Sequence, residues 1–372
     1  MKVAYINYYF DKDITPETYF TRYPSIHGWC KAISNAGFSA TVYQRFNKNQ
    51  IFKKDNVLYN LIQDSNDNNL SLLTNPVIFH NKILNENFDI IHINSFNYAF
   101  QAFLLKTKTK ASRIIIQHHA EKPWIGIRKY LQKFFLRYID GVIFSSKEIL
   151  SEWINNSVIN SEIVFAEIIE NSTDFIAGDK IKAMKKTGIN GNPVFLWVGR
   201  LNENKDPLTV VTGFKILLSE YPGAKLYMIY SENNLEMNLK EYIDSSDTLK
   251  ESIIFLGRID HSLLNDFYNS ADYFTLGSFY ESSGYSLIEA MACGVIPIVT
   301  NIPSFKTITQ SGAGGGLWKA GNTNSFYETA RNVLIQNKRY LSRGNVDIFN
   351  SELSFDAISR KAKYFYEELL RN

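Results

Sequence analysis

Short β-type runs alternate with amphipathic helical runs along this chain, and the pattern restarts near the middle of the sequence. This alternation predicts parallel sheets in which crossover helices connect the strands. The strands expected in the first half are residues 3–6, 40–43, 90–93, 114–117, 141–144 and 163–167. Those expected in the second half are residues 193–198, 225–229, 253–256, 273–276 and 295–299. The sequence therefore predicts an α/β protein with two parallel sheets.

The length of the chain and one polar segment indicate two domains. A chain of 372 residues exceeds what one hydrophobic core usually supports. Residues 178–192 are rich in Lys, Gly and Asn and are predicted to link the halves. We therefore expect domains at residues 1–177 and 178–354, with a C-terminal amphipathic helix, 355–372, that can pack back on the first domain or onto the second. Ligands of open α/β sheets bind beyond the carboxyl ends of the strands, so the chemistry is expected in the loops there.

Charge and cysteine content exclude several classes of protein. The formal net charge of +3, from 40 basic and 37 acidic residues, is too weak for a nucleic-acid-binding protein. Cys30 and Cys293 lie far apart in expected core helices, which favours buried reduced thiols and a cytoplasmic protein. The sequence has no Cys and His cluster with metal-ligand spacing, so no metal is expected. It also lacks a signal-peptide pattern and an apolar window long enough to span a bilayer, which predicts a soluble or peripheral protein.

Two carboxylates, Glu281 and Glu289, bracket the stretch Glu-Ser-Ser-Gly-Tyr-Ser-Leu-Ile-Glu. The Gly-containing turn between them precedes an expected helix at residues 286–293, and the free N–H groups at a helix N-terminus favour an anionic group. Ser286 and Glu289 also have the spacing of a capping box, which would explain Glu289 without any ligand. Glu281 is not explained in that way. This segment therefore predicts a ligand site with hydroxyl groups near the carboxylates and phosphate near the helix.

A second candidate segment follows the strand expected at residues 193–198. Arg200 and Lys205 lie in its loop, and the next helix is expected to start at Pro207 with Asp206 as its cap. Two cations in one loop, with Glu203 as the only obvious acidic neighbour, suit a diphosphate leaving group. The alternative is a solvated turn with surface ion pairs. The combination with Glu281 and Glu289 favours the diphosphate interpretation.

Together these motifs resemble those of a known family. Gly199-Arg200-Leu-x-x-x-Lys205, then Phe255-Leu256-Gly257-Arg258, then Glu281-x7-Glu289 with Glu-Ala-Met-Ala-x-Gly resemble the motif series of retaining GT-B glycosyltransferases. The resemblance is to glycosyltransferase family 4, also called glycosyl transferases group 1, and it covers nearly the whole chain. Glu170-Asn171-Ser172-Thr173-Asp174 stands where that family has Pro-Asn-Gly-Val-Asp.

The resemblance implies a GT-B fold, with two Rossmann-like domains whose parallel sheets face a central cleft. Residues 1–177 would bind the acceptor and residues 178–354 the nucleotide-sugar donor. The implied activity is transfer of a sugar, with retention of configuration, from a UDP- or GDP-sugar to a saccharide or lipid-linked acceptor. Bacterial surface polysaccharide or glycoconjugate synthesis is the implied role, and no cofactor or metal is implied.

The resemblance also implies roles for individual residues of the second domain. Arg200 and Lys205 would hold the diphosphate and stabilise it as it leaves. Glu289 would bind the ribose hydroxyls, and Glu281 those of the transferred sugar. The remaining donor-binding residues are the nucleobase-reading backbone of Arg258 and Ile259, and the turn and helix N-terminus formed by Gly284, Tyr285, Ser286 and Leu287.

In the first domain, the strand that ends at Gln117 is followed by His118, His119, Ala120 and Glu121. This segment resembles the family's strand and active-site histidine, and His119 is the match. His118 is the alternative, one register step away, because consecutive residues of a strand face opposite sides. His92, near the end of an earlier strand, is either a structural residue or an acceptor-binding one.

The first loop departs from the family pattern. Many members have a Gly-Gly pair before the first helix, whereas here Gly28 is the only glycine available to approach the donor phosphates. Residues 7–24 are rich in aromatic side chains, including Tyr9. Two interpretations stay open: an acceptor platform on which a sugar stacks, or a loop that packs on its own domain.

Residues 124–138 form a basic and aromatic amphipathic segment, with Lys106, Lys108, Lys110 and Arg113 before it. Such a helix can dock on the inner face of the cell membrane, near a lipid-linked acceptor. It can equally be an ordinary helix with one apolar face and one solvated charged face.

Two other functions remain compatible with the sequence. One is a nucleotide-sugar epimerase of the same fold, which would isomerise a donor without any acceptor. The other is a non-catalytic protein that binds a nucleotide or carbohydrate. The presence of Arg200, Lys205, Glu281 and Glu289 together argues against the second alternative.

Overall fold

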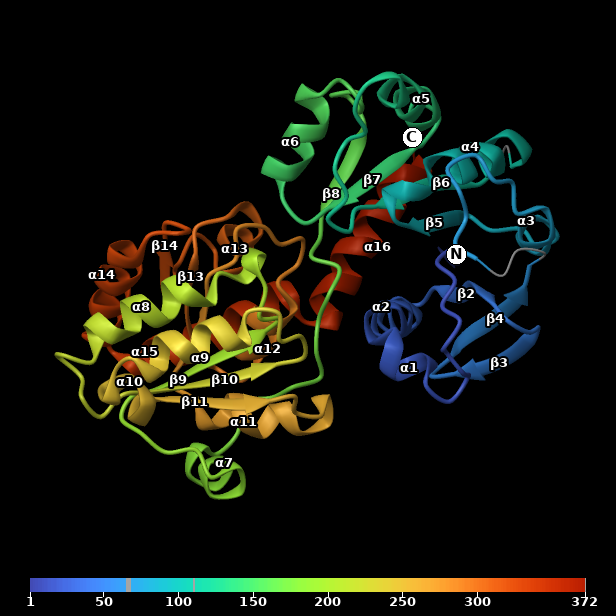
Figure 1. Cartoon of the computed structure of the whole chain (residues 1–372). Helices are drawn as coiled ribbons and strands as arrows, with labels where there is room; N and C mark the ends of the chain where they lie inside the picture. The colour runs from blue at the N-terminus through green and yellow to red at the C-terminus, as the bar shows by residue number, and fades with distance from the viewer. Residues whose placement is uncertain (65–67, 110, 372) are drawn as a thin grey trace. The chain divides into compact units, whose positions relative to one another are not determined.

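The computed structural model describes residues 1–64, 68–109 and 111–371, so Lys110 of the basic segment and Asn372 of the final helix lie outside the described residues. The chain divides into two compact units (Figure 1). The first unit comprises Met1–Glu170 and Phe355–Asn372, and the second comprises Asn171–Ser354. The chain thus leaves the first unit at Glu170, before the polar segment on which the predicted boundary was based.

The first unit is built on an eight-stranded sheet with the order β3-β4-β2-β1-β5-β6-β7-β8. Neighbouring strands are parallel except for β3 and β4, which form an antiparallel hairpin at one edge. The strands are β1 Lys2–Asn7, β2 Ser39–Phe46, β3 Gln50–Lys54, β4 Val57–Gln63, β5 Ile90–Asn94, β6 Arg113–Gln117, β7 Gly141–Phe144 and β8 Val164–Glu167. This hairpin was not predicted from the sequence, and its turn residues Asp55 and Asn56 both have positive φ, as a type I′ turn requires.

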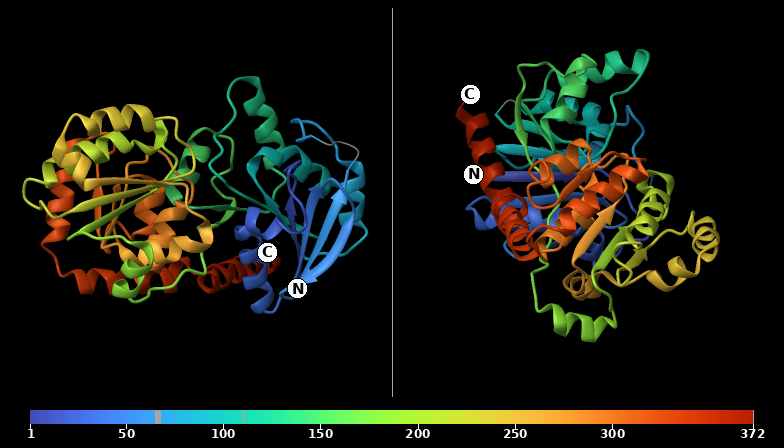
Figure 2. Two further views of the ribbon diagram at one scale, coloured as in Figure 1. Left: turned by 60° about the horizontal axis from the view of Figure 1, so that its bottom comes forward. Right: turned by 90° about the vertical axis from the view of Figure 1, so that its left-hand side faces the viewer.

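Helices cover both faces of this sheet (Figure 2). Each face has its own apolar core. Alternation along β1 directs Val3 and Tyr5 into one core and Ala4 and Ile6 into the other. The helices of this unit are α1 Tyr19–Arg22, α2 Pro24–Asn35, α3 Val77–Leu84, α4 Ala99–Lys108, α5 Ile127–Leu136, α6 Lys147–Asn155 and α16 Phe355–Arg371, with the 3-10 turn η1 Phe96–Tyr98.

The C-terminal helix α16 belongs to the first unit, where it contacts α2 and β8. Its apolar face supplies Ile358, Phe365 and Leu369 to the core that it shares with α2. Gly28 lies inside α2, and the ring of Phe355 occupies the place that a Cβ at residue 28 would need. The only glycine available before the first helix in the sequence therefore lies inside that helix, where it is a helix-packing residue.

The second unit contains a six-stranded parallel sheet with the order β11-β10-β9-β12-β13-β14. Its strands are β9 Val194–Gly199, β10 Lys225–Tyr230, β11 Ile253–Gly257, β12 Tyr273–Leu276, β13 Ile296–Thr300 and β14 Gly316–Trp318. Its helices are α7 Lys180–Thr187, α8 Pro207–Leu217, α9 Glu236–Asp244, α10 Asp247–Ser252, α11 Leu264–Ser270, α12 Tyr285–Ala292, α13 Pro303–Ile308, α14 Thr323–Leu334 and α15 Lys338–Ile348. The short turns are η2 Glu203–Lys205, η3 His261–Leu263 and η4 Phe349–Leu353.

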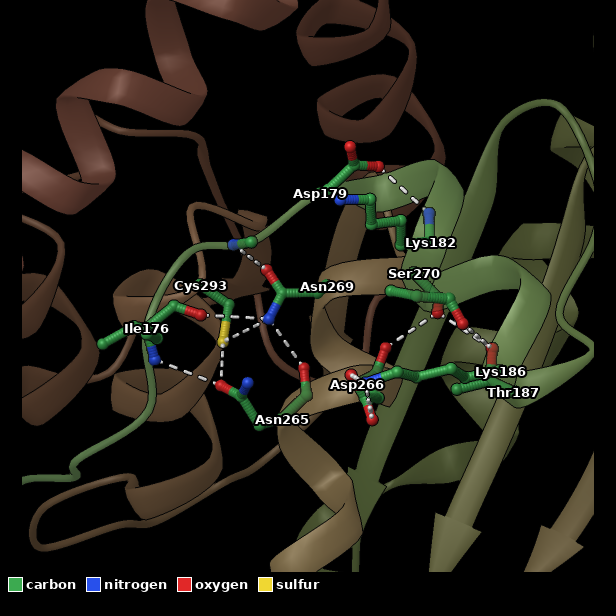
Figure 3. A network of polar contacts seen from close by, with 12 residues as sticks. Ile176, Asp179, Lys182, Lys186, Thr187, Asn265, Asp266, Asn269, Ser270 and Cys293 are labelled. Carbon is green, nitrogen blue, oxygen red and sulfur yellow. Dashed lines mark hydrogen bonds and ion pairs between the residues drawn. The ribbon is translucent and has the colours of Figure 1, made fainter.

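Within the second unit, two asparagines of α11 hold the segment that precedes α7 (Figure 3). Asn265 Oδ1 accepts the N–H of Ile176 at 3.1 Å, and Asn269 Oδ1 accepts the N–H of Gly178 at 2.6 Å. The amide of Asn269 also donates to the carbonyl of Ile176 at 3.0 Å and to Sγ of Cys293 at 3.7 Å. These bonds fasten an otherwise irregular segment to α11 and to the end of α12.

Cys30 and Cys293 are both buried free thiols, and burial raises the pKa of each. Among the described helices, none is both long and apolar enough to cross a membrane. The part of the chain that the structure describes contains no group of three His, Cys, Asp or Glu residues arranged to hold a metal ion.

Candidate active site

Lys205 and Glu281 form an ion pair at the carboxyl edge of the second unit's sheet. Lys205 ends η2 after β9, whereas Glu281 lies between β12 and α12, and β9 and β12 are neighbouring strands. Glu281 Oε1 also accepts a hydrogen bond from Ser278 Oγ at 2.8 Å. The acidic partner of Lys205 is therefore Glu281 rather than the Glu203 considered from sequence.

The loop that carries Lys205 is fixed by short-range polar contacts. Asn202 Oδ1 accepts the N–H of Lys205 at 3.2 Å and caps η2. Asp206, with φ of 39°, caps α8 by accepting the N–H of Thr209, and Pro207 is the first residue of the helix, as predicted. These contacts leave the lysine only 8% exposed, so its ammonium group is held beside Glu281.

A second link joins the two loops. Asn204 Nδ2 donates to the carbonyl of Tyr280 at 2.9 Å, and its Oδ1 accepts the N–H of Tyr280 at 3.2 Å. Gly277 lies so close to the lysine loop that a Cβ there would be 2.7 Å from the carbonyl oxygen of Asp206. The lysine and the carboxylate are thus placed by two loops that brace each other.

Arg200 is more exposed and lies apart from this pair. Its guanidinium is 3.6 Å from Glu232, and both side chains are about half exposed. A surface ion pair of this kind fixes a side chain only weakly. Of the two predicted cations, Lys205 is therefore the one that the fold holds in a defined position.

Glu289 projects from α12 and is buried, with 2% of its surface exposed. Its Oε1 accepts a hydrogen bond from His261 Nε2 at 2.6 Å, and its Oε2 accepts one from Tyr268 OH at 2.8 Å. The hydrogen bond and charge of Glu289 outweigh partial burial and raise the pKa of His261. Sequence reasoning missed both partners, which come from η3 and α11.

The capping box predicted for Ser286 and Glu289 is wrong. Helix α12 begins at Tyr285, its N-cap is Gly284, and no side chain caps it. Gly284 has φ of 54° and packs against Phe305, a conformation and a space that favour glycine. Glu289 is consequently free of the capping role and is bonded to His261 and Tyr268 instead.

The N-terminus of α12 lies between Glu281 and Glu289 in the chain, where a phosphate site was predicted. The N–H of Leu287 donates to the carbonyl of Gly284 at 2.9 Å, so this predicted donor is already used inside the helix. Tyr285 and Ser286 supply the two N–H groups that precede it. The predicted role of this helix terminus therefore falls on Tyr285 and Ser286.

The segment predicted to read a nucleobase follows β11. Gly257, with φ of 67°, ends the strand, and Arg258 and Ile259 come directly after it. Two residues further on, His261 begins η3 and bonds Glu289. The backbone of Arg258 and Ile259 is thereby tied to the neighbourhood of the carboxylate predicted to bind ribose.

In the first unit, β6 leads directly to His118 and His119, whose side chains have different surroundings. His118 is fully buried, stacks on Phe144 with ring centroids 4.8 Å apart, and donates from Nε2 to the carbonyl of Glu121. Burial lowers its pKa. The side chain of His119 is 28% exposed, so the partly accessible histidine is the one matched to the family.

His92 lies within the core on β5 and is hydrogen-bonded to Tyr366 of α16 at 2.8 Å. Burial lowers its pKa to about 3, so it is neutral at physiological pH. Of the aromatic loop at residues 7–24, Tyr8 and Tyr19 are fully buried while Tyr9 is exposed. The loop therefore packs largely on its own unit and presents Tyr9 at the surface.

The basic segment contains α5, which exposes large apolar side chains. Ile127 is 81% exposed and Tyr130 is 71% exposed, and Phe134 and Tyr138 are partly exposed. The guanidinium of Arg137 lies over the rings of Phe134 and Tyr138, at 4.3 and 4.6 Å. Its solvated face is therefore both basic and aromatic, unlike the purely polar face of an ordinary surface helix.

Comparison with known families and proteins agrees with this architecture. Residues 179–345 match the family model described as glycosyl transferases group 1. The chain is 34% identical over 123 residues to mannosylfructose-phosphate synthase of Agrobacterium fabrum, which covers 31% of this chain and 27% of that protein. It is 27% identical over 198 residues to alpha-monoglucosyldiacylglycerol synthase of Streptococcus pneumoniae, which covers 51% of this chain and 44% of that protein. The alignments thus span less than half the length of these relatives.

Among solved structures, an Anabaena protein in complex with UDP and glucose is similar over 99% of this chain and 100% of its own length. The TM-score is 0.70 and the sequence identity is 12%, so the likeness concerns the fold.

Proposed function

Since residues 179–345 belong to the glycosyl transferases group 1 family and the chain has the GT-B fold, we propose that it is a retaining glycosyltransferase. The donor is a nucleotide sugar, with UDP- and GDP-sugars as the first candidates. The acceptor is a saccharide or a lipid-linked saccharide of a bacterial surface polysaccharide or glycoconjugate. The observation that carries the proposal is the ion pair of Lys205 and Glu281, which joins two loops at the carboxyl edge of one sheet.

In this proposal Lys205 and Arg200 receive the diphosphate, whose negative charge grows as the bond to the sugar breaks. A fixed cation is effective here because it needs no reorganisation when that charge develops. The N–H groups of Tyr285 and Ser286, at the start of α12, add partial positive charge for the same phosphates. In this proposal the chain's own residues thereby stabilise the negative charge of the departing diphosphate.

Glu281 and Glu289 are assigned to hydroxyl groups. Carboxylate oxygens accept hydrogen bonds from vicinal hydroxyls, and each oxygen has two lone pairs. Glu281 is assigned to the transferred sugar because it contacts the cation proposed to hold the diphosphate. Glu289 is assigned to ribose because it is tied through His261 to the segment at Arg258 and Ile259. His119 and Tyr9 of the first unit are assigned to the sugar and to the acceptor respectively.

Binding of a nucleotide is the first expected result. Among UDP, GDP and ADP, one should raise the melting temperature clearly, because a ligand at 100 times its Kd adds about 2.7 kcal/mol of stability. The matching nucleotide sugar is then incubated with and without acceptor extracts of a polysaccharide-producing bacterium. Release of the nucleotide only with acceptor, and a product whose NMR coupling constant shows the donor's anomeric configuration, are expected.

Other outcomes separate the alternatives. An isomerised sugar formed from donor alone would identify a nucleotide-sugar epimerase. Stable binding without turnover of any sugar of that nucleotide would identify a non-catalytic binding protein. Inversion at the anomeric carbon would contradict the retaining mechanism while leaving the transferase activity.

We further propose that the segment at residues 124–138 makes peripheral contact with an anionic membrane at the cytoplasmic face. Exposed Ile127, Tyr130 and Phe134 would enter the interface, while Lys129 and Lys133 would face anionic headgroups. Each basic residue near such a surface contributes about 1 kcal/mol, which is roughly fivefold in affinity. A membrane contact would bring the enzyme close to a lipid-linked acceptor.

Sedimentation with phosphatidylcholine vesicles that contain about one third phosphatidylglycerol tests this contact. The wild-type chain is expected to sediment with these vesicles and to be released by salt. Combined Lys129→Glu and Lys133→Glu should weaken binding at least about tenfold, because two favourable charges become unfavourable. The matched control is Lys185→Glu with Lys186→Glu on α7, which should leave binding unchanged. Equal sedimentation of all three chains would contradict the membrane contact.

A further inference from the structure

Both ring nitrogens of His119 face oxygen acceptors. Nδ1 lies 3.3 Å from Oε1 of Glu170, and Nε2 is hydrogen-bonded to Oδ1 of Asn94. The same Asn94 oxygen lies 2.9 Å from Tyr5 OH, which donates to it. A neutral imidazole has a single N–H and can donate to only one of these oxygens. With the amide oxygen of Asn94 turned toward Nε2, the geometry is that of a doubly protonated imidazolium.

Glu170 is well placed to hold this charge. It lies beyond β8 and is the last residue before the chain leaves the first unit, and its side chain is 5% exposed. A buried carboxylate is costly unless a positive partner compensates it, and His119 is that partner. Burial alone would raise the pKa of Glu170, but the charge of His119 outweighs it and the pKa is lowered. Burial would likewise lower the pKa of His119, but Glu170, with a smaller contribution from the charge of Glu121, outweighs it and the pKa is raised.

None of the other titratable groups described below takes the positive charge from His119. Glu121 Oε2 accepts the backbone N–H of His119 at 2.6 Å, and its Oε1 accepts that of Phe96 at 3.0 Å. His118 and His92 have lowered pKa values because they are buried, so neither competes as a cation. Tyr5 has a pKa raised well above its usual value by burial and stays neutral.

We propose that Glu170 is a positioning residue that keeps His119 doubly protonated, so that His119 serves the substrate as a hydrogen-bond donor rather than as a base. Its role toward a substrate rests on the proposed function. The Nε2–H of His119 donates to Asn94 in this structure. In the complex it would donate to a hydroxyl oxygen of the sugar instead. The ion pair has no net charge, which suits a neutral hydroxylated ligand. Glu170 stands where the family motif has proline, so the arrangement is a property of this chain.

The charge state can be measured without any assay of activity. The six histidines are labelled with ¹³C at Cε1, and their NMR signals are followed from about pH 5.5 to 9.5, a range that brackets the ordinary histidine pKa. His119 is assigned as the signal lost in His119→Gln. It is expected to titrate above 6.5 in the wild-type chain. In Glu170→Gln its pKa should fall by about 1–3 units, since a neighbouring opposite charge shifts a pKa by that amount.

Two further variants separate a charge effect from a general structural one. Glu170→Asp keeps the carboxylate and should retain part of the raised pKa. Glu167→Gln is the matched control, because Glu167 lies on β8 and its carboxylate accepts the N–H of Lys147 instead of a histidine. It should leave the His119 titration unchanged. A wild-type His119 that titrates at or below 6.5, or one that Glu170→Gln does not shift, overturns the proposal whatever the activity.

The pH profile of transfer tests what the charge does. A raised pKa means that the imidazolium persists above pH 6.5 and is lost as the pH rises through the pKa of His119. We expect kcat/KM to fall over that same interval, and the fall to move to lower pH in Glu170→Gln by the shift measured by NMR. If the NMR shift occurs and the profile does not follow it, the donor role of His119 is overturned. If no nucleotide binds to any chain while the NMR shift stands, the proposed function fails and the charge state of His119 does not.

Discussion

Replacement of Lys205 by alanine is expected to lower kcat for sugar transfer by about 100- to 1000-fold, the usual effect of removing one group that stabilises transition-state charge. Lys205 is held by its loop and by Glu281, so its ammonium group is positioned before the reaction. Lys205→Arg keeps the charge but changes its shape and reach, and it should recover only part of the rate. Initial-rate measurements at saturating donor give the comparison.

The same substitution also affects stability, and a double variant separates the two effects. Lys205→Ala leaves Glu281 largely buried without its cation, which should lower the free energy of unfolding by about 1–3 kcal/mol, below the 3–5 kcal/mol of a fully buried pair. Adding Glu281→Gln removes the uncompensated charge and should restore most of that loss. Activity should stay low in the double variant, because neither the cation nor the carboxylate is present. Recovery of activity together with stability would mean that the pair is structural and not catalytic.

The two sheets could be predicted because hydrophobic period and strand-end loops are local properties of the sequence. The predicted α/β architecture of the GT-B fold is confirmed. The hairpin of β3 and β4 was not predicted, because its turn, Asp55-Asn56, lacks the glycine that usually marks a two-residue turn with positive φ.

The side chains that surround the candidate site were harder to predict than the site itself. Lys205, Glu281 and Glu289 belong to recognisable motifs, whereas the partners of Glu289 come from an ordinary helix and turn. Glu170 was visible only as a departure from the family motif. Its contact with His119 joins residues that are far apart in the sequence, a separation that no local pattern reports. Polar partners that are distant in the sequence are brought together by tertiary packing, so they can be identified only once the fold is known.

Gly28 provides the second large expected effect, on stability. A Cβ at this position would lie 2.0 Å from Cζ of Phe355, so an added side chain requires the ring of Phe355, or α16 with it, to move away from α2. Overpacking usually costs about 1–3 kcal/mol, and a β-branched residue adds bulk at that point. We therefore expect Gly28→Val to lower the free energy of unfolding by about 2–3 kcal/mol, measured by urea denaturation and circular dichroism.

A second glycine provides the matched control for Gly28. Gly344 lies in α15, and a Cβ there would meet nothing within 4 Å. Gly344→Ala should therefore stabilise the chain by up to about 1 kcal/mol, through helix propensity alone. Removing the opposing ring with Phe355→Ala should relieve part of the cost of Gly28→Val, because residues in contact couple by about 0.5–3 kcal/mol. Additive effects of the two substitutions, or a valine tolerated without loss of stability, would contradict direct packing of the ring on the glycine.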